Sequence, residues 1–217
     1  MNVWSAKIRQ EVQNIDCITL DLRPSKDIIS TVVLSQGTLI TLERVVIIGS
    51  SCSGKTTMAK HVAAILQVPH IELDALHWLP EWQERPDSEF RELVSSAVAR
   101  ERWVVDGNYN VVRDVVWQRA TTLVWLNHSF PVVFWRAVSR TVIRSIGRRI
   151  LFSGNKESIG QAFFSRDSMI LWVIKTFHYR RRSTREVFDG DEFPGLHRVE
   201  LRNRADANRF FTSLRDI

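Results

Sequence analysis

The stretch RVVIIGSSCSGKTT, residues 44–57, places an apolar run directly before a glycine-rich loop that contains a lysine. Residues 44–49 are typical of a short buried strand, and residues 54–67 continue with the periodicity of a helix. Between them, Gly49 to Thr56 fits the pattern GxxxxGK followed by Ser or Thr. Backbone N–H groups can turn inward in such a loop, at the positive end of a helix. The stretch therefore predicts a site for the phosphates of a nucleotide.

Individual residues of this loop have separate expected tasks. Lys55 would reach the β- and γ-phosphates of ATP, and the hydroxyl of Thr56 would bind Mg²⁺. A chance match in a Gly/Ser loop is the alternative, and the flanking strand and helix argue against it. The expected ATP-binding residues are Gly49, Ser50, Ser51, Cys52, Ser53, Gly54, Lys55, Thr56 and Thr57.

Cys52 lies inside the loop and has two interpretations. It is either a redox-sensitive thiol at the ATP site or a small residue at a tolerant position, and the second is favoured. Cys17 is the other cysteine of the chain, and the two lie far apart in sequence with no CxxC pair. The six histidines are scattered. We therefore predict neither a disulfide framework nor a structural metal.

Further apolar runs at 69–74, 102–107 and 122–127 carry a polar residue at or next to their ends. We expect each run to form a strand, with helical segments between the strands. This arrangement predicts a three-layer α/β fold with a five-stranded, mostly parallel sheet. Asp74 and Asp106 would lie at the carboxyl edge of that sheet, beside the loop. There Asp106 could hold Mg²⁺ and Asp74 could bind an acceptor or take its proton. A helix cap or a turn residue is the alternative for each.

Positive charge is concentrated in one part of the chain. Residues 132–185 carry 12 of the 30 lysines and arginines and two acidic residues, which favours a local site for a polyanion. On an expected helix at 131–150, arginines recur every four residues and share one face. They could clamp a transferring phosphate, or they could form an ordinary solvated face. These arginines are Arg136, Arg140, Arg144 and Arg148.

The length of 217 residues fits one domain with appendages. We expect a catalytic domain at 44–217 with an arginine-rich lid at about 141–185. Residues 1–43 could be an added strand or two, a flexible extension, or the product of a misplaced translation start. No apolar run approaches the roughly 20 residues that span a bilayer, and the N-terminus lacks the features of a secretory signal. These observations predict a cytoplasmic protein without a membrane partner.

The order of these motifs resembles the nucleoside monophosphate kinase branch of P-loop proteins over about residues 44–214. More narrowly, it resembles the adenylate-kinase-like proteins often labelled DNA topology modulation proteins. The segment DGNYN begins with Asp106 and Gly107, as does the DGFPR-like segment of adenylate kinases, but it lacks the arginine, for which Arg113 is the nearest substitute. The resemblance implies ATP and Mg²⁺ as cofactors and an Mg²⁺/phosphate position for Asp106. Arg136 and Arg140 match the RxxxR pattern that opens the lid in such kinases. The resemblance of the lid also makes Arg166, Arg180, Arg181 and Arg182 candidate phosphate contacts.

We therefore predict an ATP-dependent phosphotransferase that acts on a small acceptor, most simply a nucleoside monophosphate, as a monomer or homodimer. One alternative is a kinase of a small-molecule hydroxyl with Asp74 as base, and another is an ATP-dependent nucleic-acid-binding protein, which is less favoured. Trp78 and Trp82 could stack on a base or form a small hydrophobic cap. Residues 168–177 are expected to form a short apolar helix with Trp172 in the core, and a basic stretch follows them. The expected catalytic residues are Lys55, Asp106, Asp74, Arg136 and Arg140, and the expected acceptor-binding residues are Asp74, Trp78, Asn108 and Tyr109.

Overall fold

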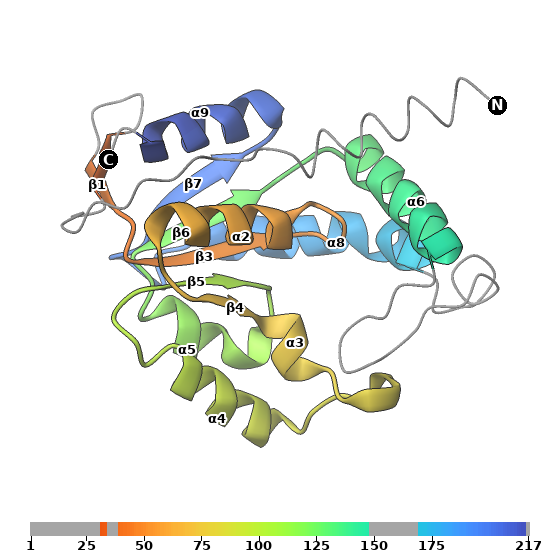
Figure 1. Cartoon of the computed structure of the whole chain (residues 1–217), viewed down its shortest axis with the longest axis horizontal. Helices are drawn as coiled ribbons and strands as arrows, with labels where there is room; N and C mark the ends of the chain where they lie inside the picture. Colours follow the sequence, from red (N-terminus) through yellow and green to blue (C-terminus); the bar gives the residue numbers. More distant parts are fainter. Residues whose placement is uncertain (1–30, 34–38, 148–168, 216–217) are drawn as a thin grey trace.

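A central sheet of five strands forms the middle of the molecule (Figure 1). The structure is a computed structural model that describes residues 31–33, 39–147 and 169–215. The strand order is β4-β5-β3-β6-β7, and every pairing in this sheet is parallel. The predicted five-stranded sheet is therefore confirmed. Its strands are β3 (Arg44–Gly49), β4 (His70–Glu72), β5 (Trp103–Asp106), β6 (Thr122–Leu126) and β7 (His197–Leu201).

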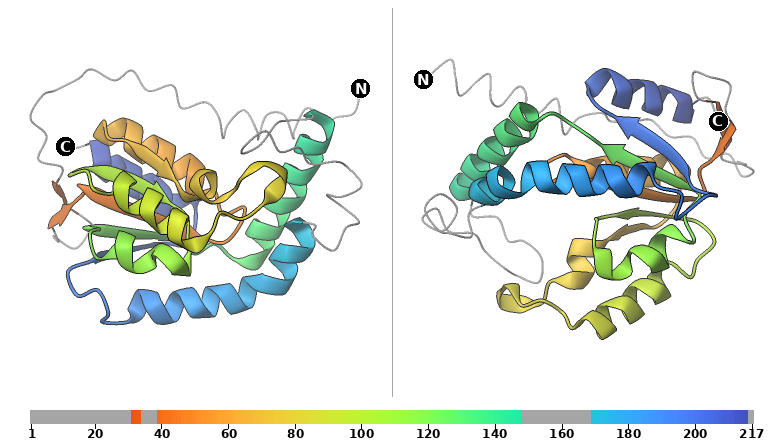
Figure 2. Two further views of the ribbon diagram at one scale, coloured as in Figure 1. Left: turned by 90° about the horizontal axis from the view of Figure 1, so that it is seen from below. Right: turned by 180° about the vertical axis from the view of Figure 1, so that it is seen from behind.

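Helices cover both faces of the sheet (Figures 1 and 2). One face packs against α2 (Lys55–Leu66) and α9 (Arg204–Arg215), and the other against α4 (Asp87–Ala97), α5 (Arg113–Trp117) and the end of α8 (Met169–Asp189). Side chains of a strand alternate between its faces. Val45 and Ile47 of β3 thus join the first core cluster, whereas Val46 and Ile48 join the second. The result is a three-layer α/β fold.

Helix α6 (Phe130–Gly147) packs beside α8 at the end of the sheet where the loop between β3 and α2 lies. The two helices and the loop share a small apolar cluster of their own. Its buried members are Cys52, Val133, Ala137, Val173 and Phe177. Short helices also lie in this part of the fold, namely α3 (Leu73–His77) and the 3-10 helices η1 (Pro80–Trp82) and η2 (Asn110–Val112).

Two expectations for the basic segment are corrected. Helix α8 runs unbroken for 21 residues, where the sequence suggested a short apolar helix followed by a basic stretch. Trp172, expected in the core, is 45% exposed, because its neighbour Val173 and the next turn's Phe177 face Cys52 and α6 instead. Arg148 and Arg166 lie outside the described residues, as does the side chain of Arg144.

Before the main sheet, β1 (Thr31–Val33) and β2 (Leu39–Thr41) form a separate antiparallel pair. Residues 1–30 and 34–38 lie outside the described part of the chain. Leu42, which precedes the domain boundary expected at Arg44, is fully buried in the first core cluster.

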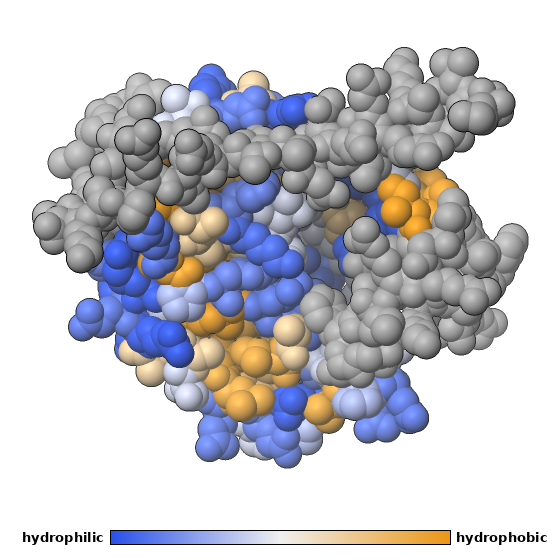
Figure 3. All heavy atoms as spheres, in the orientation of Figure 1, coloured by the Kyte–Doolittle hydropathy of each residue, from blue (hydrophilic) through white to orange (hydrophobic). Residues whose placement is uncertain are grey.

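Figure 3 shows hydrophobic residues in two parts of the described surface, one over α6 and a broader one below the centre, where Figure 1 places α3, α4 and α5. The exposed apolar residues of α6 include Val132, Trp135 and Val142. Within the described ranges, no helix combines the length and apolar character needed to cross a membrane.

Candidate functional site

The loop between β3 and α2 is tightly turned around the start of the helix. The Ser53 N–H donates to the Ser50 carbonyl at 3.1 Å, and Cys52 and Gly54 have φ angles of 63° and 94°. Left-handed positions of this kind in a turn form an anion-binding concavity of backbone N–H groups. Because α2 begins at Lys55, the unpaired N–H groups of its first turn lie at the same place. The loop therefore has the form needed to hold phosphates.

Asp106, the last residue of β5, lies next to this loop and is 1% exposed. Both of its carboxylate oxygens have partners. The Thr56 hydroxyl donates to Oδ2 at 2.5 Å, and His70 Nε2 lies 2.9 Å from Oδ1. A carboxylate only accepts hydrogen bonds, so the Nε2 atom of His70 carries the hydrogen. The structure thus brings together Thr56 and Asp106, whose hydroxyl and carboxylate oxygens suit Mg²⁺.

Asp74 does not end a strand as expected. Strand β4 stops at Glu72, and Asp74 lies in the first turn of α3. The chain turns because Leu73 packs directly over Gly107: a Cβ at Gly107, whose φ is +134°, would lie 2.8 Å from the Leu73 Cβ. Glu72, rather than Asp74, is the register partner of Asp106 at the sheet edge.

His70 and Glu72 are two residues of this site that sequence reasoning missed. The signal was the segment PHIELD, because alternate residues of a strand share a face. Burial raises the pKa of the Glu72 carboxyl, and the nearby carboxylate of Asp106 raises it further.

The Tyr109 hydroxyl donates to Asp74 Oδ1 at 2.7 Å, and Trp78 hydrogen-bonds to the same tyrosine. Burial, followed by the negative charge of Asp74, raises the pKa of Tyr109. The tyrosine ring also packs against the rings of His77 and Phe90. Three of the four residues expected to bind the acceptor therefore lie together, on one side of the loop.

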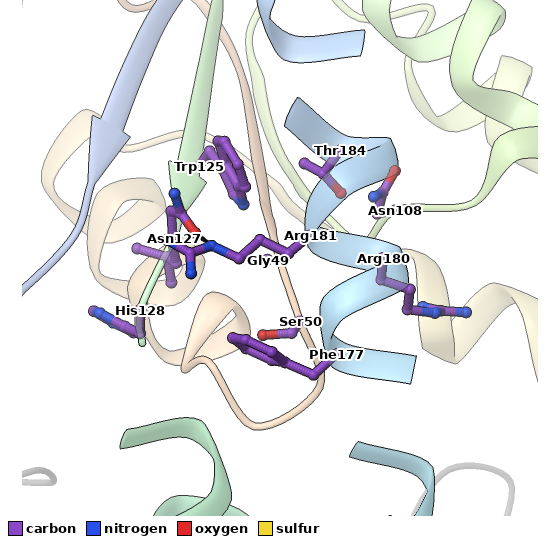
Figure 4. Close-up of a pocket in the computed structure, with 11 residues that line it drawn as sticks. Gly49, Ser50, Asn108, Trp125, Asn127, His128, Phe177, Arg180, Arg181 and Thr184 are labelled. Carbon is purple, nitrogen blue, oxygen red and sulfur yellow. Dashed lines mark hydrogen bonds between the residues drawn. The ribbon is translucent and has the colours of Figure 1, made fainter. Parts of the chain in front are cut away.

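Asn108, the fourth, faces a small pocket beside Gly49 (Figure 4). The cavity volume of about 20 Å³ is room for roughly one water molecule, and α8 contributes Phe177, Arg180, Arg181 and Thr184 to its lining. Arg181 reaches across it and donates to Asn127 Oδ1 at 2.7 Å, whereas Arg180 points to the other side. The Asn108 Oδ1 atom is buried and has no hydrogen-bond partner among the residues that the structure describes. The lining residues are Gly49, Ser50, Asn108, Trp125, Leu126, Asn127, His128, Phe177, Arg180, Arg181 and Thr184.

Arg136 and Arg140, the pair expected to open the lid, lie against the loop itself. The Arg136 guanidinium donates to the Ser53 carbonyl at 2.6 Å, and burial lowers the pKa of Arg136. Arg140 Nη1 lies 4.0 Å from the sulfur of Cys52, which is 8% exposed. Both arginines are half-buried, so at these positions the helix face is not simply solvated.

Arg113, the nearest substitute for the arginine of adenylate kinases, packs elsewhere. Its guanidinium carbon lies 5.3 Å from the centre of the Trp117 ring, and its Nη2 donates to Asn110 Oδ1 at 2.5 Å. Burial lowers the pKa of Arg113, and the charge of Glu192 opposes that effect. The described partners of Arg113 thus belong to η2, α5 and the turn before β7.

Part of the basic segment anchors α8 to the sheet. The guanidinium carbon of Arg185 lies 4.4 Å from the centre of the Trp125 ring, and the group also donates to Glu200. Arg202 and Asn127 donate to the same carboxylate. Burial alone would raise the pKa of Glu200, but these hydrogen bonds outweigh it and lower the pKa to about 2. Arg185 therefore supports the structure, although it lies inside the expected lid.

The topology and the loop together define a three-layer P-loop fold. No family model and no curated protein matches the sequence. Solved structures with a similar arrangement include a gluconokinase from Sinorhizobium meliloti 1021, at 15% identity and a TM-score of 0.44 over 81% of this chain and 93% of that one. A shikimate kinase from Aquifex aeolicus is 16% identical with a TM-score of 0.47, over 80% and 96% of the two chains. A shikimate kinase from Bacteroides thetaiotaomicron is 20% identical with a TM-score of 0.44, over 80% and 95%. These likenesses are distant and concern the fold.

Proposed function

We propose that this protein transfers the γ-phosphoryl group of ATP to a small acceptor with the help of Mg²⁺. The observation that supports this most is the 2.5 Å contact between the Thr56 hydroxyl and the Asp106 carboxylate, directly beside a phosphate-binding loop. In the proposed complex the loop N–H groups and Lys55 hold the phosphates, and Thr56 and Asp106 hold the ion. Bound Mg²⁺ would neutralise charge on the phosphates, while the protein positions the reacting groups.

Arg136 and Arg140 are proposed to add positive charge at the transferring phosphate. Both already lie at the loop, where Arg136 contacts the Ser53 carbonyl and Arg140 the Cys52 sulfur. A phosphate attracts a guanidinium more strongly than a neutral carbonyl does, because the hydrogen bond is charge-assisted on both sides. Binding of ATP would thus favour a new partner for each arginine.

Two classes of acceptor are proposed. A nucleoside monophosphate follows from the sequence resemblance, with Asp74, Trp78, Asn108 and Tyr109 as the binding residues. A small-molecule hydroxyl, with Asp74 as base, is supported by the packing of Arg113 on Trp117, because the arginine of the adenylate-kinase segment then has no direct substitute. The hydrogen bond from Tyr109 would orient the Asp74 carboxylate for that role.

A screen of purified protein with Mg-ATP and candidate acceptors, read by mass spectrometry, tests the proposal. Phosphorylation of a nucleoside monophosphate supports the first class, and phosphorylation of a sugar or another alcohol supports the second. Lys55→Ala should abolish transfer in either case, because the loop loses its charge on the β- and γ-phosphates. Lys60→Ala, at an exposed position of the same helix, is the matched control. A Lys55→Ala variant with normal turnover would contradict the proposed site.

The nucleic-acid alternative gains little from the basic segment, because Arg181 and Arg185 are engaged by Asn127 and Glu200. It predicts an affinity for duplex or single strands whose logarithm falls steeply with the logarithm of the salt concentration. Weak binding without that dependence on salt would contradict the nucleic-acid alternative.

We propose the cytoplasm, which supplies ATP and Mg²⁺, as the compartment of the reaction. Light scattering would distinguish a monomer from a homodimer.

A further inference from the structure

Asp106 is buried in a group of acidic side chains. Glu72 is its register partner on the neighbouring strand, and the charges of Asp106 and Asp74 both act on Glu72. Carboxylates so close together repel one another. Hydrogen-bond donors to Asp106 offset this repulsion and favour one orientation of its carboxylate.

His70 supplies such a donor from β4. It is the register partner of Val104, two residues before Asp106, and its ring reaches diagonally across the strand pair to Asp106 Oδ1 at 2.9 Å. Its side chain is 16% exposed, whereas that of Asp106 is 1% exposed. The bond is thus shielded from water, which would otherwise compete for Oδ1.

The geometry fixes which oxygen of Asp106 serves which partner. The terminal torsion of an aspartate is broad and roughly two-fold, so packing alone holds a carboxylate loosely. Here His70 occupies Oδ1 and thereby leaves Oδ2 for Thr56, at 2.5 Å. Without the His70 donor, Oδ1 would be a buried acceptor that lacks this partner, and rotation of the carboxylate would disturb the contact with Thr56.

We propose that His70 is a positioning residue of the magnesium site: its Nε2–H group holds Asp106 so that Oδ2 faces the Thr56 hydroxyl and the ion. This inference rests on the proposed function, because it assumes that Thr56 and Asp106 bind the Mg²⁺ of a nucleotide. It assigns His70 no contact with the nucleotide or the acceptor. Removal of the donor should therefore weaken the use of Mg²⁺ and leave metal-free nucleotide binding unchanged.

The test compares the affinity for ADP with and without Mg²⁺ by calorimetry, in wild-type protein and three variants. In His70→Gln the amide nitrogen reaches the place of Nε2, and in His70→Asn it falls about one bond short. The wild type and His70→Gln should show the same strengthening of ADP binding by Mg²⁺. In His70→Asn and His70→Ala that strengthening should fall by about tenfold, as for other residues that orient metal ligands. His197→Gln, at an exposed position of β7, is the control.

The outcomes separate the two proposals. Wild-type protein whose ADP binding does not respond to Mg²⁺ would contradict the proposed function itself. A Mg²⁺ response in the wild type that is unchanged in His70→Asn and His70→Ala would overturn the role of His70 alone. Failure of His70→Gln to match the wild type would overturn it as well, because the donor would then not be what matters. If His70→Ala does not fold, the contrast between His70→Gln and His70→Asn gives the same decision.

Discussion

At the scale of single residues, Asp106 is the side chain on which the site depends most. It is buried, it ends a central strand, and it contacts Thr56 and His70 at once. Asp106→Asn keeps the size of the side chain but removes its charge and one acceptor oxygen. Transfer at fixed Mg²⁺ should fall by about 100-fold or more, the range seen when a preorganised electrostatic contact is lost.

The measurement is kcat/KM for Mg-ATP at several Mg²⁺ concentrations, with thermal melting to show that the variant folds. Asp114→Asn, at an exposed carboxylate that pairs with Arg91, is the matched control and should keep its activity. Equal kcat/KM in Asp106→Asn and the wild type would contradict the assignment of Asp106.

Tyr109 allows a second test at this scale, on the acceptor side. Tyr109→Phe removes the hydroxyl that donates to Asp74 at 2.7 Å and keeps the ring against His77 and Phe90. The KM for the acceptor should rise by about tenfold, one lost hydrogen bond to a charged group, while the KM for ATP stays the same. Tyr179→Phe, at a side chain that is 76% exposed, should change neither constant. A larger change in the KM for ATP than in the KM for the acceptor would contradict the assignment of Tyr109 to acceptor binding.

At the scale of elements, the predictions succeeded where a pattern is local. Strand β3 runs over residues 44–49 as expected, because its apolar run and the loop that follows lie within one short stretch. Strand β4 is shorter than expected, because Leu73 packs over Gly107 from another strand end, and no pattern within 69–74 contains that contact. The continuity of α8 was missed for a similar reason: Phe188 packs on Trp125, which holds the basic half of the helix to the sheet.

Glu200 gives a prediction for this anchor of α8. Its pKa is lowered from 4.5 to about 2 in the folded protein, so its contribution to stability is fully present above about pH 4.5. That contribution is lost as the pH falls toward 2, where the carboxylate becomes protonated in the folded state as well. Glu200→Gln should lower the free energy of unfolding at pH 7 by on the order of 2 kcal/mol, since the carboxylate is largely shielded and each pKa unit is worth about 1.4 kcal/mol before solvent screening.

Urea unfolding at pH 7 and at pH 3 measures this effect. The difference in the free energy of unfolding between the wild type and Glu200→Gln should be smaller at pH 3 than at pH 7. Glu186→Gln, at an exposed carboxylate on α8, is the control and should show no such narrowing. A difference that is constant with pH would show that the Glu200 carboxylate has no altered pKa.

At the scale of the whole molecule, the sequence predicted the layers and the position of the loop between β3 and α2, because both follow from contiguous stretches of the chain. The contacts that complete the site join separate segments. His70 meets Asp106 only through the register of β4 on β5, and Arg136 meets Ser53 only through the packing of α6. Contacts between distant segments can be identified only in the folded chain. The burial of residues near the expected domain boundary also depends on such contacts.

Leu42 makes that boundary testable. The sequence predicts a domain that begins at Arg44, but Leu42 is fully buried in the core, and the carbonyl of Glu43 accepts a hydrogen bond from the Trp103 N–H at 2.9 Å. A chain of residues 42–217, with an initiating methionine, should keep the activity of the full chain. A chain of residues 44–217 should lose about 2–5 kcal/mol, as when a buried leucine is truncated. For a protein of this size, that lowers Tm by at least about 4 °C.

Thermal melting of both truncated chains, with and without Mg-ATP, gives the comparison. Leu42→Ala in the full chain isolates the side chain from the Glu43 hydrogen bond and should account for most of the loss. Leu93→Ala, on α4 at a side chain that is 39% exposed, should cost much less, because less apolar surface leaves the core. Equal Tm values for the two truncated chains would support a domain that begins at Arg44. A chain of residues 42–217 that melts well below the full chain would instead show that residues 1–41, which include the antiparallel pair β1 and β2, stabilise the P-loop domain.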